Sequence, residues 1–371
     1  MKRSIPIVIY LVSCFLPFAG IVGQTNKVFH AFYWPTGIAV DSKGNVFVSG
    51  RNNKIIKITP DGMVSDFAGD VNGYINQRDG KGATARFDHT KGIAIDVSDN
   101  IYVADYTRVR KITPDGMVTT FAGNDKSLQK DGTGTAASFR EPQNIAIDNS
   151  QNLYVTDEGF DVAKDKSFHV LRKITPKAEV TTLKNVGGTI IQINHAIGIA
   201  CDNKGNIIVC ASGSNCIKKI TPDGVITTVA GQCNKKFNSY YKEGNVTTSV
   251  LSDPFGIAIA KNGDIYFSDA SLNRIFKIAN NKMITAAGCG KMSFDGNPYG
   301  VIEPGEKDGK ALQATFDEPT GIVFDKTGNL YIVDGSGRTN SYIRKLSPDG
   351  IVSTFCKHYW NPKTEQYEEA D

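Results

Sequence analysis

The sequence predicts an all-β fold, a six-bladed β-propeller with four antiparallel strands in each blade. A segment of the type Pro-x-Gly-Ile-Ala-x-Asp recurs six times, with its first isoleucine at Ile38, Ile93, Ile145, Ile199, Ile257 and Ile322. Each copy is followed by three more short runs of β-branched and aromatic residues, and no helical periodicity appears. Six four-stranded units at regular spacing are typical of a propeller.

The second unit illustrates how one blade is expected to form. The inner strand lies within Thr90–Asp96, and the next three strands lie within 100–103, 109–112 and 118–121. The segment Thr113-Pro-Asp-Gly116 separates the third strand from the fourth. Proline presets φ for the first turn position and glycine permits a positive φ at the end, so this segment is a hairpin turn.

Packing against the propeller axis explains the small residues of the repeat. Blades converge on the axis, and each inner strand carries glycine or alanine where space is tightest, as in Gly37-Ile-Ala39. Three phenylalanines, Phe87, Phe139 and Phe316, come just before inner strands. We expect them to be core residues that wedge between adjacent blades.

The repeat resembles the NHL repeat. The resemblance rests on Pro-x-Gly-Ile-Ala-x-Asp, then Gly-Asn-hydrophobic-Tyr-Val-x-Asp, then Ile-x-Lys-Ile-Thr-Pro-Asp-Gly, and it covers about residues 34–357. The linker 130–139, Lys-Asp-Gly-Thr-Gly-Thr-Ala-Ala-Ser-Phe, resembles the one found in exported bacterial members. Some copies depart from the pattern, because blade three has Pro176-Lys-Ala-Glu179 and blade five has Ala279-Asn-Asn-Lys282 in place of the hairpin turn.

The two ends are predicted to lie outside the propeller. Residues 1–23 have a basic head, an apolar stretch and small residues, which indicate a secretory signal peptide. An uncleaved membrane anchor and lipidation at Cys14 are the alternatives. Residues 24–33 form a lead segment in which 27–32 are expected to add an edge strand near the last blade. Residues 358–371 form an acidic C-terminal tail that we expect to be mobile.

Charge and cysteine content bound the cellular setting. Signal cleavage removes Lys2 and Arg3 from 42 basic side chains and leaves 40, against 38 acidic ones. This near-neutral balance argues against nucleic acid as a partner, and no membrane span remains after cleavage. The predicted location is secreted or periplasmic, where disulfides form. Six cysteines remain, and Cys210 and Cys216 flank a hairpin where they are able to pair; the alternative is that the cysteines are small buried residues.

We expect the ligand-binding site to lie on one particular face of the propeller. The loops between the second and third strands and the linkers between blades share this face, and nearly all variation in loop length occurs there. Arginine and tyrosine at a channel mouth suit a protein, peptide or acidic ligand. The candidate ligand-binding residues are Arg51, Tyr106, Arg108, His169, Arg172, Arg274 and Arg338.

A ring of polar residues on the same face is a candidate metal site. The residue four positions before each repeat isoleucine is Trp34 in blade one, and in blades two to six it is His89, Glu141, His195, Asp253 and Glu318. Imidazoles and carboxylates bind divalent metals such as zinc or calcium. The alternative is ordinary turn chemistry before a strand, and no cofactor is otherwise predicted.

The sequence favours an exported, non-catalytic binding or scaffold protein that engages a protein, peptide or glycan. A metal-dependent lactonase- or lyase-type propeller enzyme is the alternative, with the ring as its metal site. The related amidating lyase has zinc-binding histidines between the Pro and the Gly of the repeat, and none of the six equivalent residues here is histidine. No complete catalytic set was found, which weighs against an enzyme.

Overall fold

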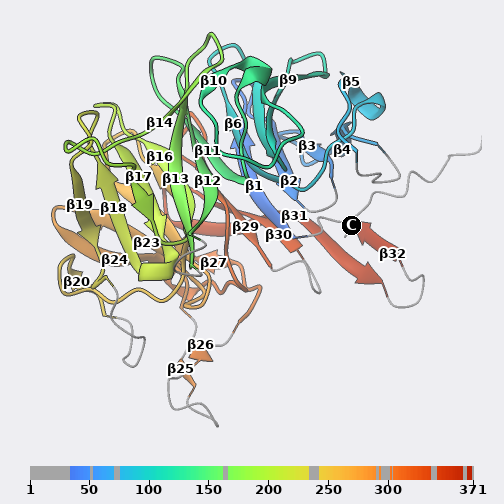
Figure 1. Ribbon diagram of the computed structural model, residues 1–371. Coiled ribbons are helices and arrows are strands. Elements are labelled where there is room, and N and C mark those ends of the chain that lie inside the picture. The colour runs from blue at the N-terminus through green and yellow to red at the C-terminus, as the bar shows by residue number, and fades with distance from the viewer. Residues whose placement is uncertain are drawn as a thin grey trace, which may run out of the picture.

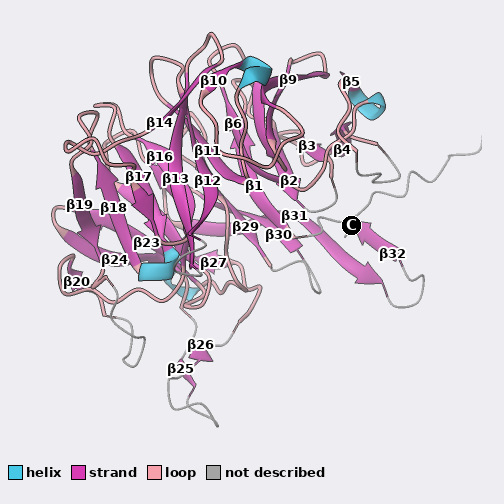
Figure 2. Cartoon of the chain, viewed as in Figure 1, coloured by secondary structure: helices cyan, strands magenta, loops and turns pink. Residues whose placement is uncertain are grey.

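The computed structural model confirms a six-bladed β-propeller (Figure 1). It describes residues 34–50, 53–70, 76–161, 166–233, 242–289, 292–293, 301–302, 304–335, 341–361 and 366–369. The fold is built almost entirely of strands (Figure 2). No helix in these ranges is long and apolar enough to cross a membrane.

Each blade is a run of four consecutive antiparallel strands, counted outward from the channel. Blade 1 contains β1 (Pro35–Val40), β2 (Val46–Gly50), β3 (Ile55–Ile58) and β4 (Val64–Ala68). Blade 2 contains β6 (Thr90–Ile95), β7 (Ile101–Asp105), β8 (Arg108–Ile112) and β9 (Met117–Gly123). Blade 3 contains β11 (Pro142–Ile147), β12 (Leu153–Asp161), β13 (Lys166–Ile174) and β14 (Glu179–Thr182).

The second half repeats this order. Blade 4 contains β16 (Ala196–Cys201), β17 (Ile207–Ala211), β18 (Cys216–Ile220) and β19 (Ile226–Ala230). Blade 5 contains β21 (Pro254–Ile259), β22 (Ile265–Asp269), β23 (Arg274–Ala279) and β24 (Lys282–Ala287). Blade 6 contains β28 (Ile322–Phe324), β29 (Leu330–Asp334), β30 (Ser341–Leu346) and β31 (Ile351–Asn361).

Four blades gain a fifth strand, which the prediction of four strands per blade missed. The linker entering the blade pairs with its outermost strand and so covers a sheet edge. The added strands are β5 (Gly80–Lys81) on β9, β10 (Gly132–Thr133) on β14, β20 (Gly244–Asn245) on β24 and β27 (Gly309–Lys310) on β31. Single 3-10 turns η1 (Gly82–Thr84), η2 (Gly134–Ala136) and η4 (Ala311–Gln313) follow three of these strands, and η3 (Ser212–Ser214) lies in blade 4.

The remaining short strands lie outside this repeating pattern. β15 (Gln192–Ile193) pairs with β13, and β25 (Met292–Ser293) pairs with β26 (Val301–Ile302). The predicted C-terminal tail contains strand structure, since β31 continues to Asn361 and pairs with β32 (Gln366–Glu369) (Figure 1). The predicted signal peptide and lead segment, including the proposed edge strand at 27–32, lie outside the described residues.

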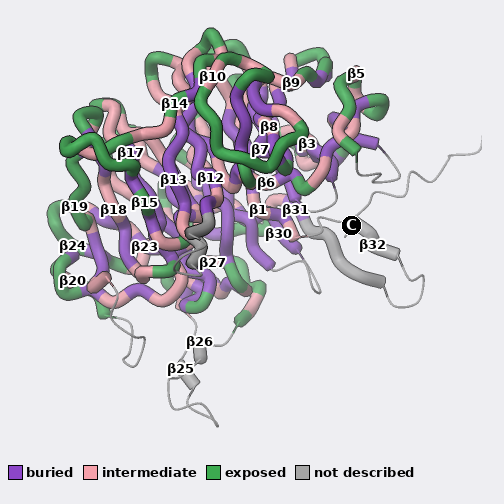
Figure 3. The backbone as a smooth tube through the Cα atoms, viewed as in Figure 1, coloured by how far each residue is buried: buried purple, intermediate pink, exposed green. Residues whose placement is uncertain are grey.

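The ring closes by packing of the last blade against the first. All the strands paired in the described sheet of blade 6 come from that blade's own part of the chain. Thr320 Oγ1 donates a hydrogen bond to the carbonyl oxygen of Pro35 at 3.3 Å, across the junction between blades 6 and 1. The core strands are buried and the connecting loops are exposed (Figure 3).

Buried arginines join the blades to their linkers. In blade 2, Arg110 donates to Asp105 at 2.8 Å and to Asp79 of the linker at 2.7 Å. Its guanidinium also lies 5.3 Å from the ring centroid of Phe87, which is fully buried as expected. Asp79 additionally accepts a bond from the Thr120 amide at 3.1 Å. The linker aspartate therefore anchors the linker to the blade.

Blades 3 and 6 repeat this arrangement. Their pairs are Arg172 with Asp157 and Asp131, over Phe139, and Arg344 with Asp334 and Asp308, over Phe316. The aspartates that end the second strands accept backbone amides, and most of these amides belong to the linker before the inner strand. The Asp88 amide, for example, donates to Asp105 at 2.6 Å.

The disulfide is not the one suggested by spacing. Cys216 pairs with Cys233, with a Cα–Cα distance of 5.2 Å. Cys210 is a free, fully buried thiol. Although Cys210 and Cys216 occupy neighbouring strands, Cys210 lies opposite Ile217 in the sheet. Its sulfur instead contacts the Gly256 carbonyl oxygen of the next blade at 3.8 Å.

Candidate functional site

The six ring residues precede the inner strands at the channel mouth. Trp34, His89, His195 and Glu318 have positive φ values between 51° and 57°, so the chain turns sharply there. The neighbouring blade fixes two of these turns, because the side-chain oxygen of Asn53 accepts the His89 amide and that of Asn273 accepts the Glu318 amide, both at 2.7 Å. The ring positions are therefore set by hydrogen bonds to the backbone.

A large cavity opens at this mouth. Its volume is about 630 Å³, within the range common for small-molecule sites. Its walls combine aromatic, apolar, charged and amide side chains from blades 1 to 5. They include Trp34, Thr36, His89, Lys91, Glu141, Gln143, Asn144, Glu158, His169, His195, Ile197 and Phe255.

A cross-blade network lies at the wall of this cavity. Lys91 Nζ, in blade 2, donates to Glu141 Oε1 at 2.5 Å and to Gln143 Oε1 at 2.8 Å, both in blade 3. Burial acts to raise the pKa of Glu141. The hydrogen bond and positive charge of Lys91, with smaller effects of hydrogen bonds to Glu158 and Gln143, outweigh it, so this pKa lies below its usual value. Glu141 is thus held as a carboxylate paired with an ammonium.

Two histidines from blades 3 and 4 approach each other beside this network. The ring centroids of His169 and His195 are 5.7 Å apart in an edge-to-face arrangement. Burial, with the nearby positive groups His195 and Lys91, lowers the pKa of His169 to about 4. His169 is therefore neutral near pH 7. Its neighbour His195 has its Nδ1 atom 2.9 Å from Ser212 Oγ.

A second, more acidic cavity of about 360 Å³ lies over blades 5 and 6. It shares Trp34, Thr36 and Phe255 with the first cavity and is also lined by Asp253, Asp317 and Glu318. Burial raises the pKa of Asp253, and the charge of Glu318 adds to this rise. Burial, followed by Glu318, also raises the pKa of Asp317.

The predicted metal ligands are divided between these two cavities. His89, Glu141 and His195 line the larger one, whereas Asp253 and Glu318 line the smaller one. Glu141 is bound to Lys91, and Nδ1 of His89 lies 2.6 Å from Asp88. In the described part of the chain, no three His, Cys, Asp or Glu side chains gather in a way that would hold a metal ion. The shared zinc or calcium site stays a prediction.

The predicted ligand-binding residues have different surroundings. His169 lines the larger cavity, and Tyr106 is 41% exposed beside His89, with 6.0 Å between ring centroids. Arg108 and Arg274 are half-buried, and Arg274 donates to the Gly288 carbonyl oxygen at 3.0 Å. Arg172 is fully buried in its ion pairs, so it is not available to a ligand. Arg51 and Arg338 fall outside the described residues.

Several cavity residues were not selected from the sequence. The second residue of the repeat segment Pro-x-Gly differs from blade to blade, and in blades 2 to 5 it is Lys91, Gln143, Ile197 and Phe255. The amidating lyase has its zinc-binding histidines at this position. This variation was the sequence signal that could have identified the position as part of a site, because a position that serves only packing would keep a similar residue in every blade.

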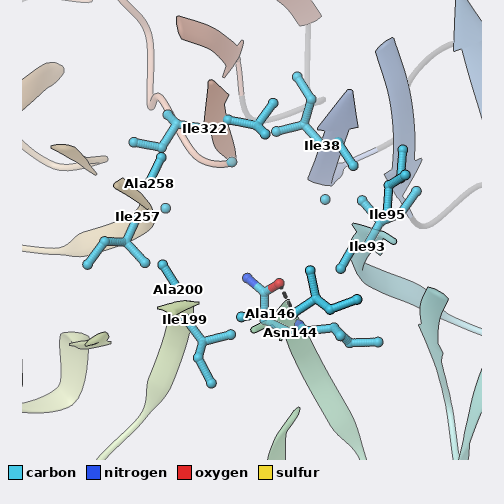
Figure 4. Close-up of a pocket in the computed structure, with 18 of the residues that line it drawn as sticks. Ile38, Ile93, Ile95, Asn144, Ala146, Ile199, Ala200, Ile257, Ala258 and Ile322 are labelled. Carbon is cyan, nitrogen blue, oxygen red and sulfur yellow. Dashed lines mark hydrogen bonds between the residues drawn. The ribbon is translucent and has the colours of Figure 1, made fainter. Parts of the chain in front are cut away.

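Below the mouth, the channel is lined mainly by isoleucine and alanine side chains (Figure 4). Its cavity is about 270 Å³. Asn144 is the one residue of its repeat position that is not glycine, and it lines both this channel and the mouth cavity. The floor of the mouth cavity thus carries an amide above an apolar passage.

No family model matches the chain. Human teneurin-4 is 28% identical to it over 168 residues, which are 43% of this chain and 5% of the teneurin. Human NHL repeat-containing protein 2 is 24% identical over 279 residues, which are 64% of this chain and 36% of that protein. The match therefore spans only a small part of the teneurin and about a third of the second relative. The match to NHL repeat-containing protein 2, the six blades and the repeat motif all indicate the same kind of propeller.

The chain is an NHL-type β-propeller.

Solved structures resemble this NHL propeller in fold. An auxiliary nutrient binding protein from Bacteroides thetaiotaomicron has a TM-score of 0.59 and 16% identity, covering 87% of the NHL propeller and 70% of that chain. A gluconolactonase from Xanthomonas campestris has a TM-score of 0.55 and 13% identity, covering 88% of each chain. At these identities the likeness establishes the fold, and one fold serves both binding proteins and enzymes.

Proposed function

We propose that this NHL propeller is an exported, non-catalytic binding protein that takes a protein segment, peptide or glycan into the mouth cavity. The observation that carries the proposal is the lining of that cavity, in which Trp34 and Phe255 accompany the Lys91–Glu141–Gln143 network. Pockets that combine apolar walls with a few placed polar groups are typical of ligand sites.

The comparisons support a binding role without identifying the ligand. Two nutrient-binding proteins from Bacteroides share the fold with TM-scores of 0.59 and 0.58. The Cys216–Cys233 disulfide is consistent with an oxidising compartment and so supports export. The enzyme alternative is not favoured, because the predicted metal ligands are divided between two cavities.

Binding is tested with residues 24–371 by thermal unfolding against panels of oligosaccharides and peptides. A ligand at a hundred times its Kd should stabilise the native state by about 2.7 kcal/mol. Lys91→Met should abolish the stabilisation by a bound ligand. The matched control is Lys204→Met, because Lys204 is exposed in a turn at the opposite end of a blade. Equal ligand binding by wild type and Lys91→Met would overturn the mouth cavity as the site.

Export is tested separately by N-terminal sequencing of the protein isolated from its native host. We expect the mature chain to begin near residue 24 and to be recovered outside the cytoplasm. Recovery of an unprocessed cytoplasmic chain would contradict the proposed location.

A further inference from the structure

His169 presents a buried hydrogen-bond donor to the mouth cavity. The residue is 3% exposed and lines the cavity. The Ala196 amide donates to its Nδ1 atom at 3.3 Å, so the proton of the neutral ring lies on Nε2. No other described residue accepts a hydrogen bond from that Nε2–H. A ligand or water in the cavity can therefore accept a hydrogen bond from this ring.

Asn144 supplies a second donor at the floor of the same cavity. Its Oδ1 atom accepts the Ile145 amide at 2.8 Å, which leaves the Nδ2 group directed into the channel (Figure 4). The other five blades have glycine here, and a side chain at this position crowds the neighbouring blade. A Cβ at Gly198, for example, would lie 2.1 Å from the Phe255 carbonyl oxygen. Blade 3 is therefore the blade in which a side-chain amide replaces the glycine of the repeat.

The charged side chains that line the larger cavity include Lys91, Glu141 and Glu158, beside three histidines. Lys91 is paired with Glu141, and the His169 ring is neutral, so neither of these two residues offers a free cation to an anionic ligand. The carboxylates Asp253, Asp317 and Glu318 line the adjacent cavity, where they would repel an anion. Trp34 and Phe255 add aromatic surface to a wall that otherwise carries donors and acceptors.

From these observations we infer that the ligand is an uncharged saccharide, and that His169 and Asn144 determine specificity by donating hydrogen bonds to its hydroxyl oxygens. The inference rests on the proposed binding function. A sugar hydroxyl both accepts and donates, so one hydroxyl satisfies a His169 or Asn144 donor and also donates to a Glu141 or Gln143 oxygen. The apolar face of a sugar ring packs against an aromatic side chain.

The test is calorimetric titration of residues 24–371 with four kinds of probe. They are neutral trisaccharides of glucose, mannose and xylose, a galacturonic acid trimer, trilysine and triglutamate. We expect a neutral trisaccharide to bind and the charged probes not to bind. Asn144→Gly, which restores the residue found in the other blades, should weaken binding about tenfold, as should His169→Phe.

Two controls separate specificity from folding. Asn149→Gly makes the same substitution at an exposed turn on the opposite face of blade 3 and should leave affinity unchanged. His169→Gln retains a donor, and its affinity should exceed that of His169→Phe.

The possible results separate failure of the saccharide inference from failure of the proposed binding function. Binding of trilysine or triglutamate alone, lost in Lys91→Met, would overturn the saccharide class and leave the binding function standing. Saccharide binding with full affinity in Asn144→Gly and His169→Phe would overturn the role of these residues. Absence of binding by every probe, here and in the thermal panels, would overturn both proposals.

Discussion

The guanidinium of Arg110 donates to the carboxylate of Asp105 at 2.8 Å, and neither side chain is exposed to solvent. The same arginine reaches the Asp79 carboxylate and the Arg86 carbonyl oxygen of the preceding linker. One buried cation thus connects the second strand, the third strand and the linker that enters the blade. Blades 3 and 6 have the same connection, whereas blade 5 has Phe276 in place of the arginine.

Arg110→Met should lower the free energy of unfolding by about 3–5 kcal/mol, because it leaves two carboxylates near the site without their cation. Urea denaturation measures this loss. Lys111→Met is the matched control, since Lys111 lies next in the strand but is partly exposed over the Tyr102 ring. A loss below about 1 kcal/mol in Arg110→Met, or an equal loss in the control, would contradict a stabilising role for the ion pair.

The fold was predictable because its signals are local and repeated. The Pro-Asp-Gly turns depend on backbone preferences within four residues, and the inner-strand glycines repeat in five of six blades. The linker strands were missed because segments such as Gly80–Lys81 carry no β-strand pattern of their own. They become strands only because the outer edge of the next blade offers unpaired backbone groups.

The site was only partly predictable, because it depends on contacts between distant residues. His169 lines the mouth cavity, and its role in ligand binding stays a prediction, but Arg172, three positions later, pairs with Asp131, 41 residues away in sequence. The sequence does not distinguish a strand arginine that is exposed to solvent from one that pairs with a buried carboxylate. Similarly, the spacing of Cys216 gave no reason to prefer Cys233, which the following linker brings alongside it.

Gly198→Ala should destabilise the propeller by about 2 kcal/mol or more, because the new methyl group would lie 2.1 Å from the Phe255 carbonyl oxygen of the next blade. The measurement is the free energy of unfolding in urea. Gly187→Ala is the control, because Gly187 is exposed and its nearest atom would be 3.5 Å away. If both variants match wild type, the close approach of adjacent inner strands would be disproved.

Cys233→Ser should lower stability by about 3 kcal/mol, since the Cys216–Cys233 bond closes a loop with a sequence separation of 17. Thermal unfolding with and without reductant measures the effect. Reductant should bring wild type down to the level of the variant and leave the variant unchanged. Cys289→Ser, which removes a free thiol, controls for the substitution itself. Equal stability of wild type and Cys233→Ser under oxidising conditions would refute the contribution of the disulfide.

The buried ring of His169 should make the protein less stable in acid. Its pKa falls from 6.5 to about 4 on folding, so as the pH drops the unfolded state binds a proton before the native state does. The contribution is therefore complete above about pH 6.5 and is lost as the pH falls toward 4, by roughly 2–3 kcal/mol at pH 4.5.

His169→Asn removes this one group, while the carboxylates that titrate in the same range remain. We expect the stability difference between wild type and His169→Asn to shift by roughly 2–3 kcal/mol between pH 7.5 and 4.5, in favour of the variant at the lower pH. Urea denaturation at both pH values gives this difference. His89→Asn removes an exposed imidazole from the same cavity and serves as the control. A constant difference across the two pH values would mean that the His169 ring takes up its proton as readily in the native state as in the unfolded chain, and the neutral donor assigned to it would be wrong.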